Sequence, residues 1–292
     1  MRAILFGASG QLGVDLARES LKRGHEVLAF GREECDITDH VAVRERIAAH
    51  RPDCVINAAA YNDVDLAETE SEAAMSVNSV AVRTLAVACA GIGATLLHYS
   101  TDYVFAGDKI SPYTEADRPC PISAYGKSKL AGEHAARANC PSHYVLRVAG
   151  VYGPPGRYTA RGNFAEFVLR SCANDVPLRI VSNQLVTPTF GPALARRSLE
   201  VLEMRIPFGL YHLGGGQKVS WLEFARRLVA AAGASADIVP VPYDKRPTRA
   251  RRPRFSALSN RKIETAGVRR MPTLDEAIRQ YLLMRRLEWP EA

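Results

Sequence analysis

The chain has 292 residues, of which 47% are hydrophobic and 24% are charged, a balance typical of a globular protein with one large domain or two small ones. No apolar run approaches the roughly 20 residues of a membrane span. Glycines follow the short apolar N-terminus at once, so we expect a first strand there rather than a signal peptide. We therefore expect a cytoplasmic protein that does not bind a membrane.

The net charge of +7 is concentrated near the C-terminus, because residues 243–292 hold 13 Lys and Arg against 6 Asp and Glu. Residues 245–254, called the basic segment below, carry most of this excess. The basic segment is either a solvated loop or a loop that closes over a phosphate-bearing small substrate. We do not expect nucleic-acid binding, because no recognition motif or set of interleaved aromatic residues accompanies the charge.

The six cysteines lie far apart in the sequence. They form no Cys-x-x-Cys pair and no His–Cys cluster at the spacing of metal ligands. We therefore expect free thiols, several of them buried, and no metal site.

The first half of the chain alternates short apolar runs of strand length with helical stretches. The predicted strands are 3–6, 26–30, 54–58, 95–100 and 144–148, and the predicted helices are 11–23, 41–50, 73–90 and 125–138. Strands that alternate with helices predict βαβ units, and therefore a parallel sheet covered on both faces.

The rhythm changes after the Pro/Gly-rich turn at 152–156. The second half predicts helices at 163–173, 191–204, 220–232 and 273–286, with a short strand at 179–181. We expect an α/β fold: a Rossmann-like doubly wound parallel sheet with a smaller C-terminal substrate-binding lobe. Residues 1–150 would form the NAD(P)-binding domain, to which 176–205 returns, and 151–292 would form most of the lobe.

Gly7, Gly10 and Gly13 follow the first predicted strand and open the first predicted helix. Glycine permits a tight turn and a close approach of the backbone to a ligand. The N–H groups at the start of the helix, at Gln11 and Leu12, are then available to a pyrophosphate. The pattern predicts a dinucleotide site, and a glycine turn without a ligand is the alternative.

The second predicted strand ends without the acidic residue that would bind a ribose 2′-hydroxyl. Arg32 can instead accept a 2′-phosphate, which favours NADPH and leaves NADH possible; a solvent-facing arginine is the alternative. Asp36, followed by Ile37, either accepts a hydrogen bond from the adenine amine or caps the next helix. The third strand ends in small residues that allow a cofactor to pack closely, namely Ala58, Ala59 and Ala60.

Tyr125 and Lys129 are four residues apart in a predicted helix and so share one face of it. The ammonium group can favour the phenolate and lower the pKa of the tyrosine from about 10. Alone this spacing is a weak signal, but Ser100 and Thr101 end the preceding apolar run and the glycine turn lies upstream. The combination indicates a nicotinamide-dependent carbonyl reductase.

Longer motifs extend along nearly the whole chain. They are residues 7–13, 57–60, 98–105 and 125–133, then Asn163-Phe164, Gln184, Pro188-Thr189 and Arg252-Pro253. With these motifs the chain resembles the extended short-chain dehydrogenases/reductases, and among them the dTDP-4-dehydrorhamnose reductases. The run from His98 to Phe105 is the most specific of the motifs.

The resemblance implies that Tyr125 donates a proton to a substrate carbonyl. It also implies that Lys129 lowers the pKa of this tyrosine and binds the nicotinamide ribose, and that Thr101 polarises the carbonyl. The hydride would come from the cofactor. Asn78 either holds the backbone open for a proton-relay water or is an ordinary helix residue.

The resemblance further implies a nucleotide-diphosphate sugar as the substrate. The polar candidates for binding it are Asp102, Arg147, Asn163, Gln184, Thr189 and Arg252. We rank Arg252 first, because a guanidinium group makes bidentate contacts with a diphosphate that a lysine cannot make.

Gly150 departs from the related reductases, which carry a tryptophan at this position over the sugar ring. The absence of this tryptophan removes a large wall of the pocket, so we expect a pocket that accepts a differently shaped or bulkier deoxysugar.

The predicted function is NAD(P)H-dependent reduction of the 4-keto group of a dTDP-linked 6-deoxyhexose in deoxysugar biosynthesis. The alternative is a non-catalytic NADP-binding regulatory subunit that resembles the one of methionine adenosyltransferase. The presence of Thr101, Tyr125 and Lys129 together favours catalysis. An epimerase or dehydratase is less favoured, because no Asp-Glu pair follows Thr101. A homodimer is compatible with the sequence.

Overall fold

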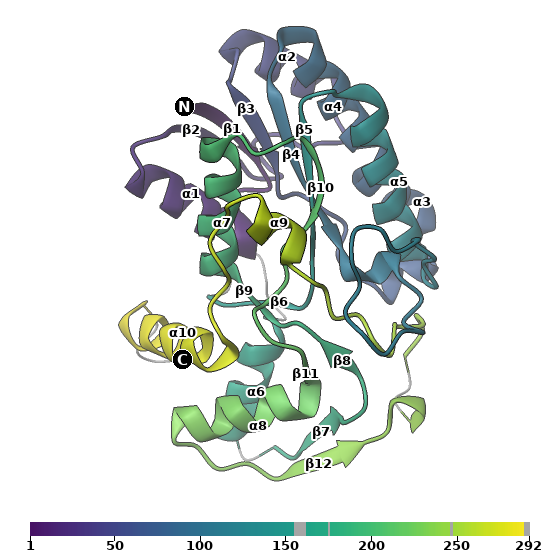
Figure 1. The fold of residues 1–292 in the computed structure, drawn as a ribbon, viewed down its shortest axis with the longest axis vertical. Helices are drawn as coiled ribbons and strands as arrows, with labels where there is room; N and C mark the ends of the chain where they lie inside the picture. Colours follow the sequence, from purple (N-terminus) through teal and green to yellow (C-terminus); the bar gives the residue numbers. More distant parts are fainter. Residues whose placement is uncertain (155–161, 175, 246–247, 289–292) are drawn as a thin grey trace.

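The protein is built on a six-stranded parallel sheet, seen in a computed structural model that describes residues 1–154, 162–174, 176–245 and 248–288. The strand order is β10-β5-β4-β3-β1-β2 (Figure 1). The winding reverses between β1 and β3, so the carboxyl ends of these strands border a crevice of the kind that binds ligands in α/β sheets. The strands are β1 Arg2–Phe6, β2 Glu26–Phe30, β3 Cys54–Asn57, β4 Thr95–Thr101, β5 His143–Val148 and β10 Gly209–His212.

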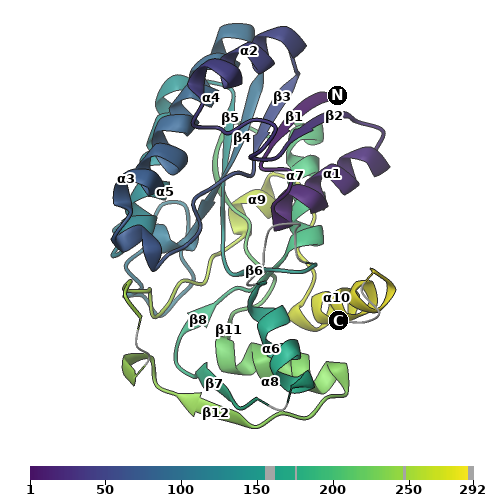
Figure 2. The ribbon, with the colours of Figure 1, turned by 180° about the vertical axis from the view of Figure 1, so that it is seen from behind.

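Helices cover both faces of this sheet, which confirms the expected Rossmann-like fold class (Figures 1 and 2). One face carries α2, α4 and α5, and the other carries α1 and α7. Their bounds are α1 Gln11–Lys22, α2 His40–His50, α4 Ala81–Ile92, α5 Ala124–Asn139 and α7 Gly191–Met204. Both α7 and β10 thus return to the sheet domain late in the chain, and β10 was not predicted.

The continuous apolar strands are explained by burial on both faces. In β1, Ala3 and Leu5 pack into the cluster on the side of α1 and α7, whereas Ile4 and Phe6 pack into the cluster on the side of α2 and α4. Successive side chains of a strand point to opposite faces, so a strand between two helical layers must be apolar at every position.

The segment between β3 and β4 is mostly helical. A short 3-10 turn, η1 (Leu66–Glu68), precedes a continuous helix made of α3 (Ser71–Met75), a π-helical turn η2 (Ser76–Val80) and α4. By length and apolar composition alone, residues 71–92 could cross a membrane, so the expectation that no apolar segment approaches that length is wrong. α4 packs against α2 and α5 and buries Ala81, Val82, Leu85, Ala86 and Cys89, whereas Val87 stays exposed.

The second half of the chain forms a smaller lobe beside the carboxyl ends of the sheet strands (Figure 1). In this lobe α6 packs against α8, β12 pairs with β7, and β11 pairs with β8. The predicted domain boundary at residue 150 stays a prediction.

The remaining elements, in the lobe and elsewhere, are β6 Val151–Tyr152, α6 Phe164–Ala173, β7 Leu178–Val181, β8 Leu185–Val186, β9 Thr189–Phe190, β11 Val219–Ser220, α8 Trp221–Ala232, β12 Ile238–Val241, η3 Asp102–Val104, η4 Tyr243–Lys245, α9 Arg261–Thr265 and α10 Leu274–Glu288.

Two features discussed from the sequence fall partly outside the described residues. They are the Pro/Gly turn, of which 155 and 156 are not described, and the basic segment, of which 246 and 247 are not described.

The close packing of α5 against η2 generates a stability prediction. A Cβ atom on Gly132 would lie 2.0 Å from the carbonyl oxygen of Asn78, whereas one on Gly91 in α4 would meet nothing within 4 Å. We expect Gly132→Ala to lower the free energy of unfolding by about 1–3 kcal/mol through overpacking. We expect Gly91→Ala, the matched control, to raise it by roughly 0.5–1 kcal/mol. Urea unfolding followed by circular dichroism measures both, and a Gly132→Ala protein as stable as the parent would contradict the close contact.

Candidate active site

The glycine turn after β1 forms a close-packed cradle at the crevice. Gly7 has a φ of 80°, and a Cβ atom on it would lie 2.4 Å from the backbone nitrogen of Ala59. A Cβ atom on Gly13 would lie 2.1 Å from the carbonyl oxygen of Gly7. Gly10 is the N-cap of α1 and has no side chain with which to cap it. The N–H groups of the first turn are thus left to a ligand, and the cradle fits a dinucleotide pyrophosphate.

A buried polar pair holds the end of β3 against this cradle. The Oδ1 atom of Asn57 accepts a hydrogen bond from the backbone nitrogen of Ala59 at 3.1 Å. The amide nitrogen of Asn57 therefore faces Nδ1 of His98, 3.1 Å away, and donates to it. Burial and the charge of Lys129 hold the pKa of His98 well below its ordinary value, so the imidazole is neutral. The predicted residues Ala58, Ala59 and Ala60 follow directly and are half-buried.

At the end of β2, Arg32 is exposed and its Nε donates to Asp36 at 3.1 Å. Asp36 also accepts hydrogen bonds from the backbone nitrogen and the hydroxyl of Thr38. The cap of α2 is Asp39, so the alternative that made Asp36 the helix cap is wrong. The side chain of Ile37 is buried in the core and offers a cofactor only its backbone.

Tyr125 lies in the first turn of α5 and its side chain is buried. Ser123 caps this helix, and the side chain of Glu68 accepts a hydrogen bond from the backbone nitrogen of Ala124 at 2.8 Å. The ring of Tyr125 meets the edge of Tyr103 at 5.9 Å between ring centres. Its hydroxyl donates to Oδ1 of Asn62 at 3.4 Å. Asn62 and Glu68 were not found from the sequence, because the stretch between β3 and α3 holds only the short turn η1 and has no periodic signal.

The electrostatics of Tyr125 differ from the expectation. Burial raises the pKa of its hydroxyl, and a hydrogen bond with Thr101 offsets only part of the effect. The amine of Lys129 donates to the carbonyl oxygen of Tyr99 at 2.6 Å. Burial lowers the pKa of Lys129 to about 8, against the influence of Glu133. The expected lowering of the tyrosine pKa by the lysine is therefore wrong for this structure.

A buried ion pair fixes α5 on the sheet. The guanidinium group of Arg147, on β5, makes two hydrogen bonds with Glu133 of α5, at 2.6 and 2.8 Å. The hydroxyl of Ser100, on β4, donates to the same carboxylate at 2.5 Å. The guanidinium also lies over the ring of Phe105, 5.0 Å from its centre. Arg147, expected as a substrate candidate, is thus occupied in the core.

Thr101 and Asp102 lie where β4 ends. The hydroxyl of Thr101 accepts from the backbone nitrogen of Tyr103 and donates to Oδ1 of Asp102 at 3.0 Å. Burial raises the pKa of Asp102 to about 7, although hydrogen bonds from Ser256 and Thr101 act in the opposite direction. Asp102 is therefore partly protonated at neutral pH, and it lies beside the predicted catalytic threonine.

Asn78 lies in the π-helical turn η2 and is not an ordinary helix residue. Its Oδ1 atom accepts from the backbone nitrogen of Tyr61 at 2.9 Å, and its amide nitrogen donates to the Tyr61 carbonyl and to the hydroxyl of Ser128. Asn78 therefore holds the segment after β3 against α5. π-Helical turns are frequent at functional sites.

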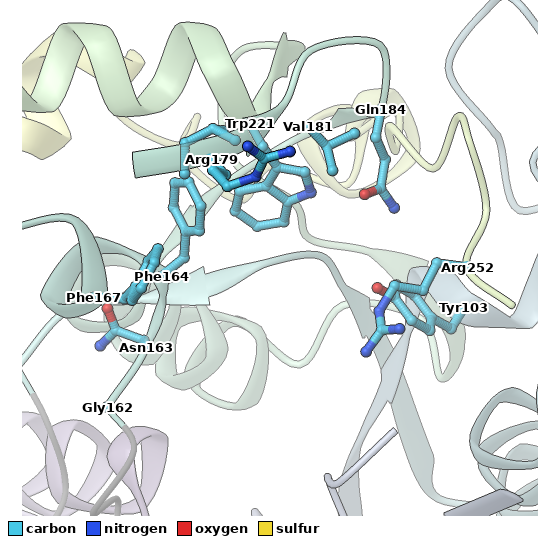
Figure 3. A pocket seen from close by; sticks show the side chains of 11 residues that line it. Tyr103, Gly162, Asn163, Phe164, Phe167, Arg179, Val181, Gln184, Trp221 and Arg252 are labelled. Carbon is cyan, nitrogen blue, oxygen red and sulfur yellow. The ribbon is translucent and has the colours of Figure 1, made fainter. Parts of the chain in front are cut away.

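A cavity of about 460 Å³ opens between the sheet domain and the lobe (Figure 3). Asn163 and Gln184 line it, as does Arg252. Asn163 caps α6 and donates to Gln11, while the amide nitrogen of Gln184 donates to the carbonyl of Pro253 at 2.9 Å. The other lining residues are Tyr103, Gly162, Phe164, Phe167, Arg179, Ile180, Val181 and Trp221.

Arg252 reaches across to the segment after β3. Its guanidinium group makes a bidentate ion pair with Asp65, at 2.7 and 3.1 Å. Asp65 also accepts from the backbone nitrogen of Ala250, and Arg249 donates to the hydroxyl of Thr69. The basic segment is thus bound to the sheet domain over 249–252 and is not a freely solvated loop there. Asp65 was not found from the sequence.

Two expectations about the pocket need correction or restriction. Thr189 is fully buried, and its hydroxyl donates to the carbonyl of Ala149 at 2.6 Å, so it lies outside the residues that line the cavity. Gly150 does not leave a missing wall. A Cβ atom on Gly150 would lie only 2.9 Å from Cη2 of Trp221, because the indole fills this space.

All six cysteines are free, and four of them are buried: Cys35, Cys54, Cys89 and Cys140. Within the described parts of the chain, no group of three or more His, Cys, Asp or Glu residues is placed to hold a metal ion.

The parallel sheet, its glycine cradle, and the threonine, tyrosine and lysine at the carboxyl edge define a nucleotide-binding α/β protein of the short-chain dehydrogenase/reductase class. Within that class the family can be stated. The chain belongs to the family described as RmlD substrate binding domain, whose model matches residues 1–286.

Named relatives agree with this assignment. The chain is 38% identical over 280 residues to a dTDP-4-dehydrorhamnose reductase of Mycolicibacterium smegmatis, covering 95% of this chain and 84% of that protein. It is 35% identical over 281 residues to the spore coat polysaccharide biosynthesis protein SpsK of Bacillus subtilis, covering 96% of each.

Solved structures extend the likeness to three dimensions. A dTDP-4-dehydrorhamnose reductase of Clostridium acetobutylicum has a TM-score of 0.93 at 31% identity, covering 98% of this chain and 100% of that one. The enzyme of Bacillus anthracis, in complex with NADP, has a TM-score of 0.92 at 30% identity and covers 97% and 99%.

The buried carboxyl group of Asp102 generates a prediction about pH. Between about pH 4 and pH 7 the unfolded chain ionises this aspartate while the folded protein holds its proton, because its pKa rises from 3.8 to about 7 on folding. The stability contributed by this group therefore falls as the pH rises through this window, by up to about 1.4 kcal/mol per pH unit. We expect Asp102→Asn to flatten the profile, measured by urea unfolding at several pH values. Asp237→Asn, at an exposed position, is the control and keeps the slope; an unchanged slope in Asp102→Asn contradicts the assignment.

Proposed function

We propose that the protein is an NADPH-dependent reductase of the 4-keto group of a dTDP-linked 6-deoxyhexose in deoxysugar biosynthesis. The observation that carries the proposal is the buried hydroxyl of Tyr125, which lies beside Thr101. The ring of Tyr125 contacts the ring of Tyr103, and Tyr103 lines the cavity. The named relatives support a nucleotide-sugar reductase, and they do not favour a non-catalytic regulatory subunit.

The dinucleotide would lie across the crevice, with its pyrophosphate at the start of α1 over Gly10, Gln11 and Leu12. Arg32, exposed at the end of β2, supports a 2′-phosphate there. When bound, NADPH supplies the hydride that reduces the keto carbon. We assign Lys129 to the nicotinamide ribose.

Tyr125 acts as the proton donor. Its raised pKa keeps the hydroxyl protonated at neutral pH, so the acid is present before the reaction begins. The proton passes to the carbonyl oxygen as negative charge develops on it. Thr101, which donates to Asp102 in this structure, is the second hydroxyl placed to polarise that oxygen. Both side chains are buried, which reduces their contact with water.

The anionic substrate is matched by the cationic side chains around the cavity. Arg252 and Arg179 both line it, and Gln184 lies between them (Figure 3). Arg252 is paired with Asp65, which holds the guanidinium group in one orientation. We assign Arg252 to the diphosphate, with Asn163 and Gln184 as further polar contacts and Asp102 near the sugar. A cytoplasmic location, a homodimer, and the absence of nucleic-acid and membrane partners stay predictions.

The function is tested by NADPH oxidation with dTDP-4-keto-6-deoxyglucose, with and without a 3,5-epimerase. Turnover only with the epimerase supports the rhamnose branch, and turnover without it supports another deoxysugar. Tight NADPH binding without any turnover would contradict the proposal and favour the regulatory subunit.

Removing the proton donor should slow the chemical step. We expect Tyr125→Phe to lower kcat by about 10²–10⁴-fold while the Kd for NADPH stays nearly unchanged. Tyr211→Phe is the matched control, because Tyr211 is also buried but lies in β10 at the edge of the sheet, where its hydroxyl donates to the carbonyl oxygen of Pro207. An unchanged kcat in Tyr125→Phe would overturn the role of this residue.

Arg32 should distinguish the two nicotinamide cofactors. We expect Arg32→Ala to raise the Kd for NADPH about 10-fold and to leave the Kd for NADH unchanged, since a hydrogen bond to a charged group contributes about 1.5 kcal/mol. Calorimetric titration measures both constants. Arg44→Ala, an exposed arginine of α2, is the control, and equal weakening of both cofactors by Arg32→Ala contradicts the phosphate contact.

A further inference from the structure

A hydrogen bond joins the glycine cradle to the cavity. Gln11 is the first residue of α1, and its Oε1 atom accepts from the amide nitrogen of Asn163 at 3.2 Å. Gln11 belongs to the sheet domain, in the turn assigned to the pyrophosphate, whereas Asn163 caps α6 in the lobe and lines the cavity. The two residues are 152 positions apart in the chain. The two predicted ligand sites are therefore linked through two side chains.

The orientation of the Asn163 amide is fixed at both of its ends. Its Oδ1 atom accepts from the backbone nitrogens of Ala165 and Glu166, at 3.1 and 3.2 Å. Its nitrogen also donates to the carbonyl oxygen of Gly153 at 2.7 Å. A backbone N–H can only donate and a carbonyl oxygen can only accept, so the oxygen and nitrogen of this amide cannot be exchanged. Gln11 must therefore present its oxygen to Asn163.

This constraint leaves the nitrogen of the Gln11 side chain unpaired. Nε2 is shielded from solvent and meets no hydrogen-bond acceptor among the described residues. A buried donor that makes no hydrogen bond is unfavourable. Gln11 lies in the turn whose backbone N–H groups are left to a ligand, so a phosphate oxygen is an acceptor that fits this donor.

The start of α6 forms one wall of the cavity. Phe164 and Phe167 line the cavity together with Asn163, on the side opposite to Tyr103 and Arg252 (Figure 3). α6 also packs against α8 within the lobe. The position of Asn163 therefore sets the position of this wall.

On the basis of the proposed function, we infer that Gln11 is a positioning residue that couples the two ligand sites, so that bound NADPH tightens the binding of the nucleotide sugar. In the free protein the unpaired Nε2 favours other orientations of this amide, in which the hydrogen bond from Asn163 is lost. When Nε2 donates to a pyrophosphate oxygen, the amide keeps the orientation that holds Asn163 and the first turn of α6. Because coupling is reciprocal, the nucleotide sugar also tightens the binding of NADPH.

The coupling is measured by calorimetric titration of dTDP into the protein, with and without saturating NADPH. dTDP lacks the sugar that meets the nicotinamide, so a direct contact between the two ligands does not contribute. We expect the Kd for dTDP to fall about 5-fold when NADPH is bound. Equal Kd values in the two states would overturn the inference alone. If dTDP binds in neither state, the nucleotide-sugar assignment fails, and the inference fails with it.

Two substitutions break the link at its two ends. Asn163→Ser keeps an oxygen that can cap α6 but removes the donor to Gln11. Gln11→Met keeps the length of the side chain but removes its amide. We expect each to reduce the ratio of the two dTDP constants from about 5 to about 1. We expect Gln11→Met also to raise the Kd for NADPH alone about 10-fold, and Asn163→Ser to leave it nearly unchanged.

The ratio separates coupling from direct contact. A contact between Asn163 and dTDP itself, when lost, weakens binding equally in both states and leaves the ratio unchanged. Asn174→Ser, at the other end of α6, is the matched control and keeps the ratio of the parent protein. A ratio that stays at the parent value in Asn163→Ser or in Gln11→Met contradicts the inference.

Discussion

The buried ion pair between Arg147 and Glu133 is the contact on which the arrangement of the site depends. It joins β5 to α5, and the hydroxyl of Ser100 on β4 binds the same carboxylate. Breaking such a pair leaves an uncompensated buried charge and costs about 3–5 kcal/mol, so the helix has little freedom to slide on the sheet. Lys129 lies one turn before Glu133 and Tyr125 one turn before Lys129, so the register of this helix places both at the end of β4.

Burial then sets the protonation of the groups that this register brings together. It raises the pKa of Tyr125 and of Asp102 and lowers the pKa of Lys129, because loss of water disfavours the charged form of each. Tyr125 therefore carries its proton, which suits reduction of a ketone rather than activation of a nucleophile. The low dielectric of this buried environment also strengthens each hydrogen bond made to a developing charge.

Charge also links the two parts of the chain. The bidentate pair of Arg252 with Asp65 connects the basic segment to the loop after β3. From the same loop, Glu68 accepts from the first turn of α5, next to Tyr125. One short stretch of chain, 62–68, thus contacts both the lobe and the helix of the proton donor. A ligand that binds Arg252 must compete with Asp65 for its guanidinium group.

Local sequence determined five strands of the sheet, β1 to β5, together with the glycine cradle and the shared face of Tyr125 and Lys129. These features depend on short apolar runs that alternate with helical stretches, on the conformational freedom of Gly7 and on the four-residue spacing of Tyr125 and Lys129. All of these signals act between near neighbours in the chain. The strand β10 escaped prediction because its place is given by pairing with β5, more than 60 residues away.

The tertiary structure alone decided which partner each site residue meets. The amine of Lys129 donates a hydrogen bond to the carbonyl oxygen of Tyr99, Arg252 forms an ion pair with Asp65, and the indole of Trp221 fills the space beside Gly150. In the last two cases residues far apart in the chain come into contact. Such contacts follow from how the lobe packs on the sheet, and residue spacing in the sequence carries no information about them.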